Sequence, residues 1–156
     1  MKNLKEKKYK ILINAGSLFS GGTLSIARDL INEFCENNRF DVFVVVHKKI
    51  LYSNPSCRYI EIPWIKNSWL HRIFFETIYI NYLIKKFNIN FLFCSHDFSS
   101  YVFDKKVKQY VYCHNPSMFA RPTLTDLRFN YKHFIFCFIY KYIYRFNIHS
   151  NKLIFF

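Results

Sequence analysis

Residues 10–31, KILINAGSLFSGGTLSIARDLI, decide the fold, because two different hydrophobic patterns meet in this stretch. The short apolar run at 9–14 predicts a buried β-strand. From Thr23 the apolar side chains recur at helical spacing, which predicts an amphipathic helix. Its apolar face carries Leu24, Ala27, Ile31 and Phe34. The loop in between therefore joins the carboxyl end of a strand to the amino end of a helix, as in a βαβ unit.

The remaining chain repeats this alternation of strand and helix patterns. Further strands are predicted at 41–47, 57–63, 89–95, 108–114 and 151–156. Long helices are predicted at 67–88, with Asn67 or Ser68 as the cap, and at 128–147. This alternation predicts an α/β fold, a Rossmann-like, doubly wound parallel sheet with helices on both faces. No linker or internal repeat interrupts it, so residues 1–156 are predicted to form a single domain.

All three glycines of the chain, Gly16, Gly21 and Gly22, lie in the loop after the first strand. The loop nearly matches the phosphate-binding motif GxxxxGK[ST], but Gly22 stands in place of the lysine that reaches the phosphates. Its spacing also differs from the dinucleotide-binding motif GxGxxG. Two alternatives remain. The glycines serve only a tight turn, or they let an anionic ligand approach free N–H groups at the helix terminus.

Polar residues follow three of the predicted strands. His47 follows the second strand, His96 and Asp97 follow the fourth, and His114 and Asn115 follow the fifth. In an open α/β sheet, ligands bind outside the carboxyl ends of the strands. A single histidine in such a place is commonly a packing or capping residue. Two polar clusters and a glycine loop at one edge favour a ligand site.

Five cysteines stand at positions 35, 57, 94, 113 and 137. Their odd number and the absence of a CxxC pair favour reduced, mostly buried thiols in a cytosolic protein. A zinc site from Cys94, His96, Cys113 and His114 is disfavoured, because the adjacent residues Cys113 and His114 point to opposite faces of a strand. No metal is therefore expected.

The formal net charge is +13, from 23 basic and 10 acidic residues. Such a charge makes nucleic acid a candidate partner, but the basic residues are mostly lysines spread along the chain. After Asp126 the chain has no acidic residue and is basic and rich in aromatics, which suits an anionic membrane surface better than DNA. Neither a signal peptide nor a transmembrane span is evident. We expect a cytoplasmic protein with peripheral contact to the inner face of the cytoplasmic membrane.

Three stretches together resemble the amino-terminal half of GT-B-fold glycosyltransferases of the family-4 type. They are KILINAGSLFSGGTLSIARDLI (10–31), RIFFETIYINYLIKKFNINFLFCS (72–95) and QYVYCHNPSMF (109–119). The resemblance rests on the order and spacing of the glycine pair, of the Arg and Glu in a long helix, and of the HNP triplet. It implies transfer of a sugar from a nucleoside-diphosphate sugar to a hydroxyl, in polysaccharide or lipopolysaccharide assembly, without a cofactor or metal.

The resemblance also implies roles for individual residues. The loop residues Gly21, Gly22 and Thr23 would approach the donor diphosphate, and His114 would contact the donor sugar. Should the reaction invert the anomeric centre, Asp97 or His114 would be the base. The acceptor side or the cleft would be formed by Gly16, Arg72, Glu76, His96 and Asn115. From composition alone, however, the i, i+4 pair Arg72 and Glu76 is interpreted as a solvated surface pair.

The donor-binding half of that family has no counterpart in this chain. The strand at 151–156 stops where the family continues, so we expect a truncated glycosyltransferase that is inactive alone. The expected partners are a nucleotide-sugar donor and a glycan or lipid-linked acceptor, with no nucleic acid. The alternative is a non-catalytic, basic Rossmann-like module that binds a membrane surface or a partner chain.

Overall fold

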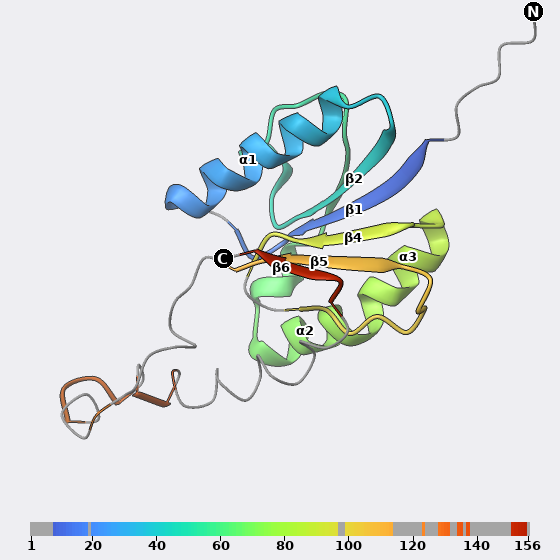
Figure 1. The fold of residues 1–156 in the computed structure, drawn as a ribbon. Helices are drawn as coiled ribbons and strands as arrows, with labels where there is room; N and C mark the ends of the chain where they lie inside the picture. The colour runs from blue at the N-terminus through green and yellow to red at the C-terminus, as the bar shows by residue number, and fades with distance from the viewer. Residues whose placement is uncertain are drawn as a thin grey trace, which may run out of the picture.

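The computed structural model describes residues 8–18, 20–96, 99–113, 123, 128–131, 134–135, 137 and 151–155, with the side chains of 153–155 left out. Within this part, the chain forms a six-stranded parallel sheet with strand order β3-β2-β1-β4-β5-β6 (Figure 1). Because all six strands run the same way, their carboxyl ends share one edge. The fold class predicted from the sequence is confirmed.

The strands of the sheet are β1 (Tyr9–Ala15), β2 (Phe40–Val46), β3 (Arg58–Glu61), β4 (Phe91–Cys94), β5 (Lys108–Tyr112) and β6 (Leu153–Phe155). The α-helices are α1 (Gly21–Glu36), α2 (Trp69–Phe74) and α3 (Ile80–Phe87). A π-helical turn, η3 (Phe75–Tyr79), joins α2 to α3. Two short 3₁₀ helices are η1 (Lys49–Leu51) and η2 (Pro63–Lys66).

The central strand β1 has helices on both sides, which explains its unbroken apolar run. Helix α1 covers one face of the sheet, and the α2–η3–α3 segment covers the other (Figure 1). Successive side chains of β1 point to opposite faces. Ile11 and Ile13 therefore pack in the cluster of α1, whereas Leu12 packs with Phe75 and Leu83. Each such side chain contributes about 1.5–3 kcal/mol by leaving water.

The long helix predicted at 67–88 is confirmed, but the π-helical turn interrupts it. Ser68 is its N-cap, because its side chain accepts a hydrogen bond from the backbone N–H of His71. Asn88 ends the segment in the left-handed conformation, with φ of 53°. The other long helix, predicted at 128–147, falls mostly outside the described residues, although 128–129, 131, 134–135 and 137 are helical.

The structure corrects the prediction that all the cysteines are reduced. Cys35, in the last turn of α1, forms a disulfide with Cys57, just before β3. Their Cα atoms are 6.4 Å apart, within the normal range for a disulfide. The sequence indicated reduced thiols because the number of cysteines is odd and no CxxC pair occurs. The bonded pair is separated by 22 residues, and only the packing of α1 beside β3 brings the two residues together. Cys94, Cys113 and Cys137 keep buried thiols, as predicted.

Candidate functional site

The candidate site lies at the carboxyl edge of the sheet, where β1 and β4 end. Among the residues predicted from the sequence, Asp97, His114 and Asn115 lie outside the described part of the chain. Apart from Arg72, which is partly buried on α2, the other predicted residues divide into a buried polar network and an open loop. The network contains Gly16, Glu76 and His96, and the open end of the loop contains Gly21, Gly22 and Thr23.

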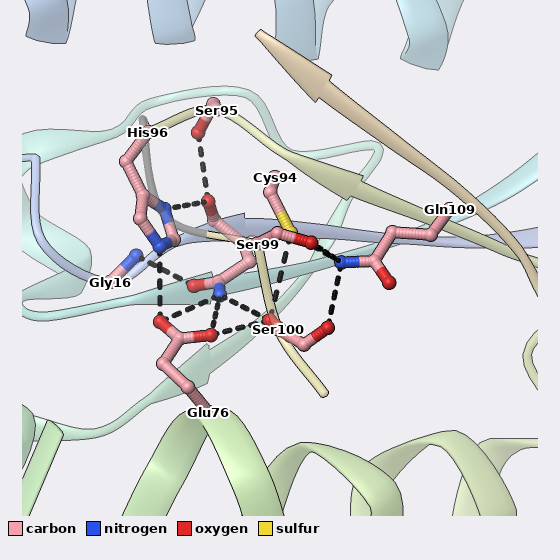
Figure 2. A network of polar contacts seen from close by, with 9 residues as sticks. Gly16, Glu76, Cys94, Ser95, His96, Ser99, Ser100 and Gln109 are labelled. Atoms are coloured by element: carbon pink, nitrogen blue, oxygen red, sulfur yellow. Dashed lines mark hydrogen bonds and ion pairs between the residues drawn. The ribbon is translucent and has the colours of Figure 1, made fainter. Parts of the chain in front are cut away.

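The carboxylate of Glu76 is the centre of the buried network (Figure 2). The side-chain amide of Asn14 donates to both of its oxygens, at 3.2 and 3.0 Å. The hydroxyl of Ser100 donates to Oε2. The Nε2 atom of His96 lies 3.0 Å from Oε1. Glu76 itself is only 1% exposed, so these three side chains replace the water that a carboxylate normally requires.

His96, which follows β4, contacts β1 through one ring nitrogen and the η3 turn through the other. Its Nε2 atom faces Glu76, and its Nδ1 atom lies 3.2 Å from the backbone carbonyl of Asn14. Both partners are acceptors, so both hydrogen bonds form together only when each ring nitrogen carries a hydrogen. When both ring nitrogens carry a hydrogen, Glu76 and His96 make a buried ion pair.

The surroundings of Glu76 set its pKa. Burial, the largest single influence, raises the pKa because it penalises the charged form. The positive charge of His96 and the hydrogen bonds from His96 and Ser100 act against burial, as does the charge of Arg72. Together they outweigh burial and hold the pKa of Glu76 below its usual value. The carboxylate is therefore charged in the folded protein at neutral pH.

The position of Glu76 corrects the interpretation of Arg72 and Glu76 as a solvated surface pair. Glu76 faces the sheet, next to the buried Phe75, and Arg72 is partly buried. The sequence contains a signal for this, because Glu76 lies four residues before Ile80 and shares the apolar face of the helix. The π-helical turn at Phe75–Tyr79, a feature that often occurs at functional sites, then carries the carboxylate to the ends of β1 and β4.

Further polar groups tie the neighbouring strands to the network. The hydroxyl of Ser95 donates to the carbonyl of Asn14 at 2.8 Å. The side-chain amide of Gln109, on β5, donates to the Ser100 carbonyl and the Ser99 hydroxyl, each at 2.9 Å (Figure 2). Sequence reasoning missed these residues. The available signal was a polar Asn14 inside an otherwise apolar central strand, which is costly unless it is hydrogen-bonded.

Cys94 adjoins this network without the properties of a nucleophile. Its sulfur lies 3.6 Å from the Ser100 hydroxyl and 3.7 Å from the Gln109 amide nitrogen. Burial and the nearby charge of Glu76 raise the pKa of its thiol to about 11. At neutral pH the thiol is therefore protonated, and the thiolate that nucleophilic catalysis requires does not form.

The three glycines of the loop have different surroundings. A Cβ on Gly16 would lie 2.8 Å from Cδ1 of Ile65, so a side chain there requires the buried Ile65 side chain to shift. Gly21 has φ of 69°, a left-handed conformation that other residues rarely adopt. A Cβ on Gly21 or Gly22 would meet no atom within 4 Å, so the space above both residues is open.

The amino end of α1 is open to a ligand in the described structure. Its N-cap, Ser20, makes no side-chain capping bond, and the hydroxyl of Thr23 donates to the Ser20 carbonyl at 3.2 Å instead. The first N–H groups of a helix have no partner within the helix. They carry partial positive charge and bind anions. The loop is thus anchored to the buried network through Gly16, and its other end offers open N–H groups.

Within the described part of the chain, no three His, Cys, Asp or Glu side chains form a group that could hold a metal ion. In the same part, no helix has both the length and the apolar character to cross a membrane. No protein-family model matches the sequence, and no curated protein is significantly similar to it. The resemblance to glycosyltransferases therefore rests on the order and spacing of the motifs alone.

Proposed function

We propose that this chain is the acceptor-side, amino-terminal domain of a GT-B-type glycosyltransferase. The observation that carries the proposal is the loop after β1. Its first residues are fixed by the buried network, and Gly21 and Gly22 at its end leave open space beside the amino end of α1. A parallel α/β sheet binds ligands at this edge. An open, glycine-lined helix terminus suits a diphosphate.

In the proposed reaction, a hydroxyl oxygen of the acceptor forms a bond to the anomeric carbon of a nucleoside-diphosphate sugar. The bond between that carbon and the diphosphate oxygen breaks, and the diphosphate leaves with the electron pair. The acceptor hydroxyl passes its proton to a base or to the leaving diphosphate. Gly21, Gly22 and Thr23 would stabilise the charge on the leaving diphosphate through their backbone N–H groups. His114 would contact the donor sugar, and Asp97 or His114 would be the base of an inverting reaction.

Glu76 and His96 have a different role in this proposal. Both are almost fully buried, so neither side chain reaches a substrate in this structure. They are positioning residues, which hold the ends of β1 and β4 together and fix the start of the glycine loop. Binding sites depend on such supporting hydrogen bonds, because a loop that moves by an ångström loses its alignment with the ligand.

The proposal is tested by equilibrium binding of radiolabelled nucleoside-diphosphate sugars to the purified chain. We expect weak, saturable binding that the substitution Gly22→Val abolishes, because the new side chain occupies the open space. Ser25→Val is the matched control, since Ser25 is exposed on α1 one turn further along. Equal binding by the wild type and Gly22→Val, or no binding of any such sugar, would overturn the proposal.

One observation favours a second candidate, a module that binds a membrane surface. The α2–η3–α3 segment exposes several large apolar side chains, with Leu70 77% exposed. The others are Trp69, Ile73, Phe74, Ile78 and Tyr82. Lys85 and Lys86 extend the same segment with positive charge. Sedimentation with anionic vesicles, compared with Leu70→Ser, tests this candidate, and the same sedimentation by both proteins would contradict it.

A further inference from the structure

A hollow of about 450 Å³ lies next to the buried network, between the loop after β1 and the start of α2. Seven residues line it: Ser17, Ile65, Lys66, Asn67, Ser68, Trp69 and Arg72. Two of these side chains are basic and none is acidic. The lining comes from both the glycine loop and the η2–α2 segment, so the hollow lies at the edge of the sheet where the proposed reaction would occur.

Positive charge is concentrated around this hollow. Burial and the positive charge of Lys48 both lower the pKa of Lys66. Burial, Lys66 and Lys48 lower the pKa of His47 as well, and outweigh the opposing effects of a backbone hydrogen bond at Pro63 and of the negative charge of Glu61. These groups therefore lie close enough to repel one another. Gathering like charges costs free energy, which a bound anion offsets.

Two buried polar atoms in this region have no hydrogen-bond partner in the described structure. They are the Oγ atom of Ser17 and the Nδ1 atom of His47. Ser17 lines the hollow itself. A buried hydroxyl without a partner costs free energy, so such groups commonly mark the position of a ligand or an ordered water. An oxyanion in the hollow would accept a hydrogen bond from Ser17.

We propose that this hollow binds a phosphate or diphosphate group, held by Lys66, Arg72 and Ser17. Arg72 supplies a planar, multi-donor guanidinium and Lys66 a point charge, a combination that suits phosphoryl oxygens. The group belongs to the acceptor, an assignment that rests on the proposed function. In the proposed function, the donor diphosphate binds at Gly21 and Gly22, and the hollow is a second site that binds an anion. The phosphate binding itself does not depend on that function.

The residues around the hollow indicate which kind of molecule carries the phosphate. Trp69 lines the hollow and is about half exposed, and its ring lies 6.0 Å from the guanidinium carbon of Arg72. Leu70 and Ile73, on the same helical turns, are also exposed. A phosphate linked to an apolar chain would cover these side chains and gain affinity from their burial. A phosphate on a water-soluble sugar would not.

Trp69 provides a direct reporter of binding. The chain has two tryptophans, so Trp64→Phe leaves Trp69 as the only one. We expect inorganic pyrophosphate to change its fluorescence saturably. Lys66→Gln or Arg72→Gln should weaken that binding about tenfold or more, because each removes a charged hydrogen-bond donor. Lys86→Gln is the matched control and should leave the affinity unchanged, since Lys86 is an exposed lysine outside the hollow.

Binding of geranyl diphosphate, compared with that of inorganic pyrophosphate, distinguishes a lipid-linked acceptor from a water-soluble one. Tighter binding of geranyl diphosphate supports a lipid-linked acceptor, and equal affinity supports a water-soluble phosphorylated acceptor. The absence of saturable binding for both ligands would overturn the proposal. So would binding to Lys66→Gln and Arg72→Gln that matches the wild type. This titration uses no nucleotide sugar. A negative result here is therefore distinguishable from a failure of nucleotide sugars to bind at Gly21 and Gly22.

Discussion

The Nε2 atom of His96 lies 3.0 Å from a carboxylate oxygen of Glu76, across 20 residues of sequence and in the interior of the protein. The pair connects the helical segment on one face of the sheet to the ends of β1 and β4. Through Asn14 it reaches the glycine loop, because the Asn14 side chain accepts a hydrogen bond from the N–H of Gly16. Hydrogen bonds centred on the Glu76 carboxylate thus connect the helical segment, the two strands and the loop.

Removal of this carboxylate should destabilise the protein strongly. The substitution Glu76→Ala leaves the donors of Asn14, Ser100 and His96 without their acceptor. We expect the free energy of unfolding in urea to fall by about 3–5 kcal/mol, as for other broken buried ion pairs. Glu33→Gln is the control, an exposed glutamate on α1 that should change stability by less than about 0.5 kcal/mol. A similar small effect of both substitutions would show that the network does not stabilise the fold.

The stability of the protein should fall in acid partly because of Glu76. Its pKa is lowered in the folded state, so the unfolded chain binds a proton at a higher pH than the folded one. The stabilisation from Glu76 is therefore complete above its ordinary pKa of 4.5 and is lost as the pH falls through the lower, folded value. Urea unfolding from pH 7 to pH 3 measures this loss.

The isosteric variant Glu76→Gln isolates this contribution from the other carboxylates. Its stability should be lower than that of the wild type at pH 7, and the difference should shrink as the pH falls below 4.5. A difference between the two proteins that stays constant over the whole range would contradict the lowered pKa of Glu76.

The three glycines should respond differently to alanine. Gly21→Ala places a side chain at positive φ and should cost about 1–2 kcal/mol of stability. Gly16→Ala brings a Cβ against the buried Ile65 and should cost about 1 kcal/mol or more. Gly22→Ala meets open space inside a helix and should stabilise the fold by up to about 1 kcal/mol. Thermal unfolding of the three variants checks this order, and a loss of stability in Gly22→Ala would contradict it.

The disulfide between Cys35 and Cys57 should contribute to stability. Its closed loop spans 22 residues, for which loop-closure entropy gives about 3 kcal/mol. Cys35→Ser and Cys57→Ser should each lose this amount, and the double substitution should lose no more, because the bond is shared. Thiol titration of the unreduced, unfolded wild type should find three reactive thiols among the five cysteines. Five reactive thiols would show that the bond is absent.

The sequence predicted the sheet and its helices well, because local patterns determine these elements. The apolar run of β1 and the helical spacing after Thr23 needed no tertiary information. Predicting the hydrogen-bond partners of Glu76 did require tertiary information. Asn14, His96 and Ser100 come from distant segments that only the strand order brings together. For the same reason the disulfide was missed. The π-helical turn has no simple signature in hydrophobic spacing, which continues smoothly from Glu76 to Ile80.

The candidate site was predicted in part. Strand-end reasoning directed attention to His96 and to the edge of the sheet where the buried network lies. It did not reveal that His96 is buried, because a polar residue after a strand points to solvent or to a neighbour according to the surrounding packing. The hollow at Lys66 and Arg72 was not predicted, although the family resemblance named Arg72 as an acceptor-side or cleft residue. Its lining comes from the loop after β1 and from the η2–α2 segment, which only the fold brings together.

The most direct test of the proposed function uses the scarcity of glycine in this chain. Selective ¹⁵N-glycine labelling gives an NMR spectrum with three backbone signals, from Gly16, Gly21 and Gly22. During titration with nucleoside-diphosphate sugars, we expect the signals of Gly21 and Gly22 to shift saturably and that of Gly16, packed against Ile65, to shift least. If Gly21 and Gly22 do not respond to any such sugar, the loop is not a donor diphosphate site and the proposed function is wrong.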